Sequence, residues 1–94
     1  MKIPKKLKIG NLIYDVGELV DSEASHFGKS SQKEQWLRIS KNLKSDDARI
    51  NTFFHEIIHQ ILDQAHFYKE SEDEKMIDCI ANGFYQVLKD NKLF

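Results

Sequence analysis

The sequence has few of the residues that cross-link or interrupt a chain. It contains one cysteine, Cys79, so no internal disulfide can form, and such sparing use of cysteine is typical of a reducing compartment. Residues 1–16 include no apolar run long enough for a secretion signal or a membrane span. We therefore expect a cytoplasmic protein with no membrane partner.

An excess of charge of one sign is also lacking. Fourteen lysines and arginines nearly balance fifteen aspartates and glutamates, so no large field attracts nucleic acid or an anionic membrane. The basic cluster at residues 2–8 has neither arginine nor interleaved aromatic residues, which is more typical of a solvated strand edge. We therefore expect no nucleic-acid partner.

Linkers, repeats and low-complexity segments are absent as well, which favours a single domain over residues 1–94. The composition, 40% hydrophobic and 31% charged, is that of a globular chain. Residues 5–20 alternate roughly between apolar and polar side chains around Gly10–Asn11, which predicts two strands joined by a tight turn. Residues 21–33 are typical of a loop, and a third strand is predicted around Trp36.

The second half of the chain predicts two amphipathic helices. The first begins after Ser45, a good N-cap, and the second after Ser71, which forms a capping box with Glu74. The connection at 66–71 is short, so we expect the helices to pack on each other and on the sheet. Apolar residues recur at helical spacing: Ile50, Phe53, Phe54, Ile57, Ile58, Ile61, Leu62 and Ala65, then Met76, Ile77, Ile80, Ala81, Phe84, Val87 and Leu88. The predicted fold is α+β, with a small antiparallel sheet of about three strands packed on two main helices.

Residues 55–59, HEIIH, interrupt the apolar pattern of the first helix. His55 and His59 differ by about 40° around the helix axis, so their imidazoles project side by side, as two ligands of one zinc ion must. Glu56 points about 100° away, and in a zincin the glutamate at this place deprotonates the metal-bound water. Two such histidines can also serve as ordinary hydrogen-bonding residues, but the regular helix around them favours a metal site.

A zincin site needs a third protein ligand and an open position for water. The second helix carries Asp78 and Asn82 four residues apart, on a flank that can face the histidines if the helices pack by their apolar stripes. Asp78 is the candidate third ligand, and Asn82 is a candidate partner that orients a ligand histidine through its other ring nitrogen. Glu74, one turn before Asp78, is the reserve ligand, and a capping role explains it equally well.

HEIIH followed by DCIAN at residues 78–82 resembles the HExxH metallopeptidases of the ImmA/IrrE-like class, especially the very small versions encoded by phages and mobile elements. In that family the second helix bears E-x-x-A-N/D, and its glutamate is the third zinc ligand. The resemblance covers residues 45–91 and, more loosely, the first half of the chain. It implies a minimal zincin-like domain in which Asp78 stands where the family has glutamate. Aspartate is one methylene shorter, so the helices must lie closer or the metal is held less well.

Two further residues have candidate roles beside the metal. Tyr85 lies on the Asp78 flank, where a phenol could donate to a developing oxyanion, and His66 shares the azimuth of the histidine pair and could reach toward substrate. The simpler interpretations are a tyrosine between core and solvent and a polar helix terminus. Cys79 lies on the opposite flank from Asp78 and is not expected to bind metal.

The resemblance implies a zinc-dependent metallopeptidase whose substrate is a peptide or protein, such as a regulatory repressor. The strand around Trp36 is the expected sheet edge on which an extended peptide docks. The alternative is a catalytically inactive zinc-binding structural or interaction protein, in which the metal chiefly stabilises the fold. A third interpretation is a metal-free helical module that binds a partner.

Overall fold

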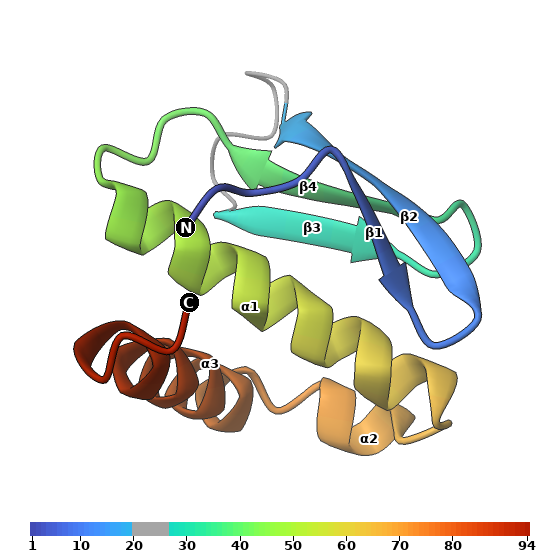
Figure 1. Cartoon of the computed structure of the whole chain (residues 1–94). Helices are drawn as coiled ribbons and strands as arrows, with labels where there is room; N and C mark the ends of the chain where they lie inside the picture. Colours follow the sequence, from blue (N-terminus) through green and yellow to red (C-terminus); the bar gives the residue numbers. More distant parts are fainter. Residues whose placement is uncertain (20–26) are drawn as a thin grey trace.

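The computed structural model describes residues 1–19 and 27–94; residue 20, the end of the predicted strand pair, and residues 21–26, the first part of the predicted loop at 21–33, lie outside the described residues. The described residues form four strands and three helices (Figure 1). Their bounds are Lys6–Ile9 for β1, Leu12–Leu19 for β2, Gly28–Ser31 for β3, Trp36–Ser40 for β4, Asp46–Gln64 for α1, Tyr68–Ser71 for α2 and Glu74–Asp90 for α3.

One mixed sheet contains the four strands in the order β1-β2-β4-β3. β1 and β2 pair antiparallel through the predicted turn, where Gly10 adopts the left-handed φ of 58° that glycine tolerates. β3 and β4 also pair antiparallel, whereas β2 and β4 pair parallel. The predicted α+β class is confirmed; the sheet differs from the expectation in having a fourth strand and one parallel pair.

The extra strand, β3, lies within the predicted loop. Its sequence, GKSS, has no apolar residue whose alternation could signal a strand. β3 forms because β4 pairs with it on one side and α1 packs against it. This strand also moves β4 to the interior of the sheet, so the prediction that the strand around Trp36 is the sheet edge is wrong, and β3 is the edge on that side.

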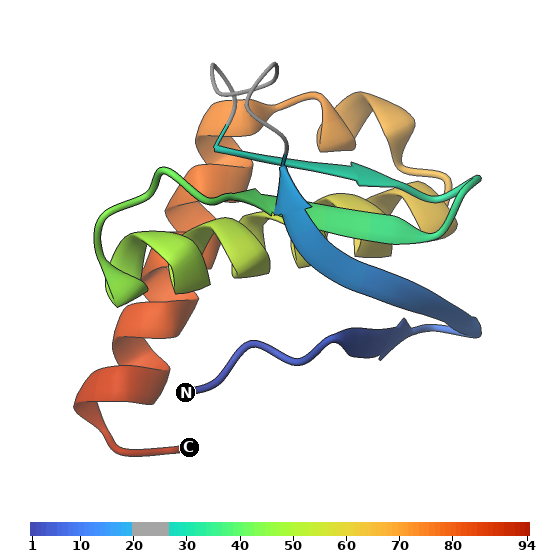
Figure 2. The same cartoon turned by 90° about the horizontal axis from the view of Figure 1, so that it is seen from above.

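The helices form two successive layers rather than one. α1 covers one face of the sheet, against β3, β4 and β1, and α3 packs mainly on the opposite side of α1 (Figures 1 and 2). Leu37, Ile39 and Phe53 form the centre of the core between sheet and α1. We expected both α1 and α3 to pack on the sheet; α1 does so, whereas α3 packs mainly on α1. Among the described residues, no helix combines the length and apolarity that crossing a membrane requires.

The N-termini of α1 and α3 are both capped by a side chain, and the cap of α3 differs from the predicted one. Ser45 accepts a hydrogen bond from the Ala48 amide at 3.1 Å, as predicted. α3 begins instead after Asp73, whose carboxylate accepts from the Met76 amide at 3.1 Å. The predicted capping box at Ser71 is wrong, because the chain forms one further helical turn, α2, and Ser71 is its buried last residue. This turn frees both Ser71 and Glu74 for contacts with α1.

Candidate metal centre

His55 and His59 lie side by side on the flank of α1, as their spacing predicts. Their ring centroids are 4.8 Å apart and their Nε2 atoms 3.1 Å apart. Their side chains keep 13% and 15% of their exposure, so the pair is shielded from bulk water and still reachable. A catalytic zinc site keeps one position open to water or substrate, and this partial exposure is compatible with such a site.

Glu74, from the first turn of α3, completes a three-residue cluster with the histidines. Its carboxylate oxygens lie 2.9 Å from His55 Nε2 and 2.8 Å from His59 Nε2. Around a tetrahedral zinc ion, ligand atoms at bond lengths of about 2.0–2.2 Å are separated by about 3.3–3.5 Å. Each histidine faces a different oxygen of Glu74, and one donor atom from each of the three residues can be chosen so that all lie within 4.8 Å of one another. Side-chain adjustments can therefore bring the three donors around a zinc ion. Among the His, Cys, Asp and Glu side chains of the described residues, His55, His59 and Glu74 form the group that lies close enough together to hold a metal ion.

The other ring nitrogen of each histidine is held by a second side chain. Asp78 Oδ1 lies 2.7 Å from His55 Nδ1, and Ser71 Oγ lies 3.0 Å from His59 Nδ1. Such partners fix the ring orientation and leave the Nε2 lone pair for a metal. Asp78 thus occupies the Nδ1 side of the ring, away from the nitrogen that faces the cluster, and the geometry favours the reserve ligand, Glu74, as the third ligand.

Ser71 contacts the candidate site, although its sequence pattern predicts a different role. A serine followed three residues later by glutamate has the pattern of a capping box. Ser71 lies beside His59 because it ends the short helix α2. The sequence of α2 has no pattern that predicts a helix. Asn82, by contrast, is exposed and lines the larger cavity, and the orienting role expected of it is filled by Asp78 and Ser71.

Tyr85 and His66 lie away from the cluster. The Tyr85 hydroxyl donates to Asp47 at 2.6 Å, two turns before His55 along α1, and this hydrogen bond raises the pKa of Tyr85. His66 follows the end of α1 with φ at 65° and stacks on the Tyr68 ring at 5.7 Å. The structure therefore does not bring either residue to the metal centre.

Glu56 projects from α1 toward β3, about a quarter turn from the histidines. Its side chain is buried, and Ser30 on β3 donates a hydrogen bond of 2.6 Å to its Oε1. Burial raises the pKa of Glu56, while the Ser30 hydrogen bond and the charges of His59 and His55 act in the opposite direction. A carboxylate with a raised pKa accepts a proton more readily, as a general base beside a metal must.

Glu56 stands at the end of a chain of buried and partly buried polar side chains between α1 and the sheet. Ser30 accepts from Gln60 Nε2 at 2.8 Å, and Gln60 Oε1 accepts from the Tyr14 hydroxyl at 2.7 Å. Gln64 Nε2 in turn donates to the Tyr14 oxygen at 3.0 Å. Every donor in this chain points toward Glu56, so the chain holds the Glu56 carboxylate in place. The apolar pattern of α1 did not predict this chain of hydrogen bonds. Polar side chains occupy three of the buried positions on the face of α1 toward the sheet: Thr52, Glu56 and Gln60.

Two cavities flank the cluster and share three lining residues, Gly28, Glu56 and Glu74. The larger, about 550 Å³, extends toward the start of α1, and the smaller, about 350 Å³, extends toward its end and includes His59. Because Gly28 belongs to β3 and Glu74 to α3, the two cavities follow α1 between that edge strand and that helix. The candidate metal centre lies where they meet.

Comparison of the chain with protein-family models, with curated proteins and with solved structures gave no match. The assignment of a function therefore rests on the geometry of this centre.

Proposed function

We propose that this chain is a zinc-dependent metallopeptidase that hydrolyses peptide bonds, of the small ImmA/IrrE-like kind that its motifs resemble. The observation that carries the proposal is the convergence of His55 Nε2, His59 Nε2 and the Glu74 carboxylate within 2.8–3.1 Å of one another. Two imidazoles and one carboxylate are the donor set of a catalytic zinc that keeps a fourth position open.

Zinc held by these three residues would supply a Lewis acid that polarises a carbonyl and lowers the pKa of a water. Glu56 takes the proton from the attacking water, and the hydroxide oxygen forms a bond to the carbonyl carbon. When the C–N bond breaks, Glu56 returns that proton to the leaving amine. Ser30 holds one carboxylate oxygen of Glu56 throughout and so keeps the base from rotating away.

The substrate enters as an extended polypeptide along β3. This strand is the last in the sheet order and its Gly28 lines both cavities, so a peptide added to its outer edge passes the metal centre. We propose a protein substrate, by analogy a regulatory protein, in a cytoplasmic setting and without a nucleic-acid partner. The nearly balanced charge of the chain supports the last point.

A second candidate function is a zinc site that stabilises the fold without catalysis. The observation that favours it is the way the cluster joins α3 and α2 to α1, through Glu74, Asp78 and Ser71. In a chain of 94 residues, metal that ties helices together contributes to folding directly. In a purely structural zinc site, Glu56 does not act as a general base.

One experiment separates the two candidates. Wild type and Glu56→Gln are purified, their zinc content is measured, and both are incubated with denatured casein. The peptidase predicts about one zinc per chain in both proteins and casein cleavage by wild type alone. Equal zinc with no cleavage by either protein favours the structural site, and cleavage by both removes Glu56 from the mechanism.

A further inference from the structure

The hydrogen bonds that end at Glu56 begin at the main chain of β1. Gln64 Nε2 donates to the Ile9 carbonyl oxygen at 2.9 Å and to the Tyr14 hydroxyl at 3.0 Å. From Tyr14 the hydrogen bonds continue, side chain by side chain, to Glu56. We call the side chains between the Ile9 carbonyl and Glu56 the interior network: Gln64, Tyr14, Gln60 and Ser30. This network joins the first hairpin of the sheet to the candidate general base.

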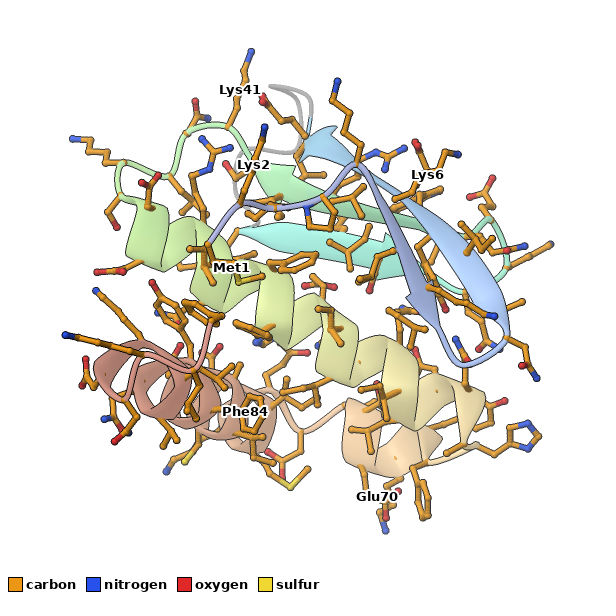
Figure 3. The ribbon with its side chains drawn as sticks, in the orientation of Figure 1. Met1, Lys2, Lys6, Lys41, Glu70 and Phe84 are labelled. Atoms are coloured by element: carbon orange, nitrogen blue, oxygen red, sulfur yellow. The ribbon has the colours of Figure 1, made fainter. Side chains whose placement is uncertain are left out.

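Tyr14 and Gln60, the middle members of the interior network, are 0% and 1% exposed. Tyr14 faces α1, because neighbouring residues of a strand point to opposite sides of the sheet and the pair Lys6–Asp15 occupies the other side. Figure 3 shows Lys6 on the side of the sheet away from the helices. Hydrogen bonds so far from solvent cannot exchange a partner for bulk water. The loss of one member therefore changes the orientation of the next.

The direction of each hydrogen bond in the interior network follows from its start at a main-chain carbonyl. The Ile9 oxygen can only accept, so Gln64 turns its amide nitrogen toward it and toward Tyr14. The Tyr14 hydroxyl has one proton, and since it accepts from Gln64, that proton goes to Gln60 Oε1. Gln60 therefore donates through Nε2 to Ser30, whose single proton is left for the carboxylate.

The Ser30 proton determines which oxygen of Glu56 stays available. Ser30 holds Oε1 at 2.6 Å, so Oε2 is the oxygen left to take a proton from a water. Glu56 lines both cavities that meet at the candidate metal centre. A carboxylate that is held at one oxygen keeps the other at a fixed place in these cavities, as a general base needs in order to meet the attacking water.

We propose that Gln60 and Tyr14 are positioning residues of the peptidase. They orient the Ser30 hydroxyl, which holds Glu56 Oε1 and so presents Oε2 to the water. Both are too deeply buried to bind a substrate themselves, so each acts through Ser30. The inference rests on the proposed function, because it gives these residues a part in the hydrolysis.

Kinetic coupling between Gln60 and Ser30 tests this proposal. Gln60→Met removes the donor to Ser30 with little change in volume, and it should lower kcat about three- to tenfold at an unchanged KM, the range given by one hydrogen bond. In the Ser30→Ala background the same substitution should leave kcat unchanged, because its effect passes through Ser30. The rates are measured with a casein peptide that zinc-loaded wild type cuts. Equal losses in both backgrounds would show a merely structural role and overturn the proposal.

The infrared spectrum of the metal-free protein gives a second measurement that needs neither zinc nor hydrolysis. At alkaline pH, the antisymmetric carboxylate stretch of Glu56 is the band that wild type has and Glu56→Gln lacks. We expect Gln60→Met to shift this band in the same direction as Ser30→Ala does, and Tyr14→Phe to shift it by a smaller amount. In the Ser30→Ala background, Gln60→Met should add no shift. A band that keeps its position in Gln60→Met overturns the proposal.

Ser40 supplies a matched control. It is a buried serine of β4 whose hydroxyl oxygen accepts from the Asn42 amide at 3.2 Å, outside the interior network. Ser40→Ala should leave both kcat and the Glu56 band unchanged, although it also removes a buried hydroxyl. If Ser40→Ala moved either quantity as much as Gln60→Met does, the cause would be a general loosening of the fold, and the proposal would fail.

The two measurements separate a failure of this inference from a failure of the proposed function. Cleavage by wild type, with an unchanged rate in Gln60→Met, keeps the peptidase and removes the positioning role. A Glu56 band that responds to Gln60 through Ser30, in a protein that cuts nothing, supports the direction of the hydrogen bonds and removes the peptidase together with the catalytic part of the proposal.

Discussion

Replacing Gly28 with alanine should loosen the contact between β3 and α1. A Cβ at this position would lie 2.6 Å from Thr52 Cγ2, 3.0 Å from the Arg38 carbonyl oxygen and 3.2 Å from Glu56 Cγ. Contacts of this kind force neighbours to shift and typically cost about 1–3 kcal/mol. The gain from a less flexible unfolded chain is about 0.4–1 kcal/mol, so the net loss of unfolding free energy should be about 1–2 kcal/mol. In a domain of this size each kcal/mol lowers Tm by about 4–8 °C.

The chain provides a matched control at Gly83, which lies inside α3, where an added Cβ would meet nothing within 4 Å. Gly83→Ala should stabilise the protein by about 0.5–1 kcal/mol through helix propensity alone. Urea unfolding at constant metal concentration measures both changes. If Gly28→Ala proved as stabilising as Gly83→Ala, β3 would not approach α1 as closely as described.

A double substitution tests the cause. Thr52→Ser removes the methyl group that the new Cβ meets first, so Gly28→Ala combined with Thr52→Ser should recover part of the loss. Recovery should stay incomplete, because the contacts with Arg38 and Glu56 remain. Strictly additive effects of the two substitutions would refute the steric explanation.

Three further predictions concern the polar residues of the site. Tyr14→Phe removes the donor to Gln60 Oε1 inside the core and should cost about 1–3 kcal/mol in urea unfolding; a change below 0.5 kcal/mol (roughly that of a surface substitution) would contradict the buried chain. Because burial raises the pKa of Glu56, the folded state binds more protons than the unfolded state between the unfolded and folded pKa values, so metal-free wild type loses stability as pH rises through that range. Glu56→Gln should therefore be more stable than wild type at pH 7 in EDTA, by on the order of 1 kcal/mol, and the difference should vanish below about pH 4; a constant difference across pH would show that ionisation is not its cause. Ser71→Ala should weaken zinc binding by about tenfold in a chelator competition, since His59 loses the partner of its Nδ1, and an unchanged affinity would show that Ser71 only fills space.

The features of the fold that the sequence predicts are those with a repeating pattern. The spacing of apolar residues in α1 and α3, together with the Ser45 cap, correctly predicted these two helices. It also supported the correct fold class, α+β. β3 has no such pattern, because neighbours alone make GKSS a strand. The parallel pair of β2 and β4 follows from that missed strand, since β3 takes the outer position beside β4.

The candidate site also has features that the sequence predicts and features that it does not predict. The spacing of His55 and His59 sets their direction within one helix, and the structure places them side by side as expected. The choice between Asp78 and Glu74 depends on how α3 approaches α1, which a single helical period does not determine. The added turn of α2 favours Glu74, because it places the start of α3 beside the histidines. The roles predicted for Tyr85 at an oxyanion and for Asn82 beside a histidine also depended on how α3 approaches α1.

We propose that Glu74 binds the metal and that Asp78 orients His55. Zinc affinity by chelator competition, for wild type, Glu74→Gln and Asp78→Asn, tests this division directly. We expect one zinc per chain in wild type, a loss of zinc affinity of about 10–100-fold for Asp78→Asn, and a larger loss for Glu74→Gln. Wild type that takes up no zinc, or an Asp78→Asn loss that exceeds that of Glu74→Gln, would contradict it.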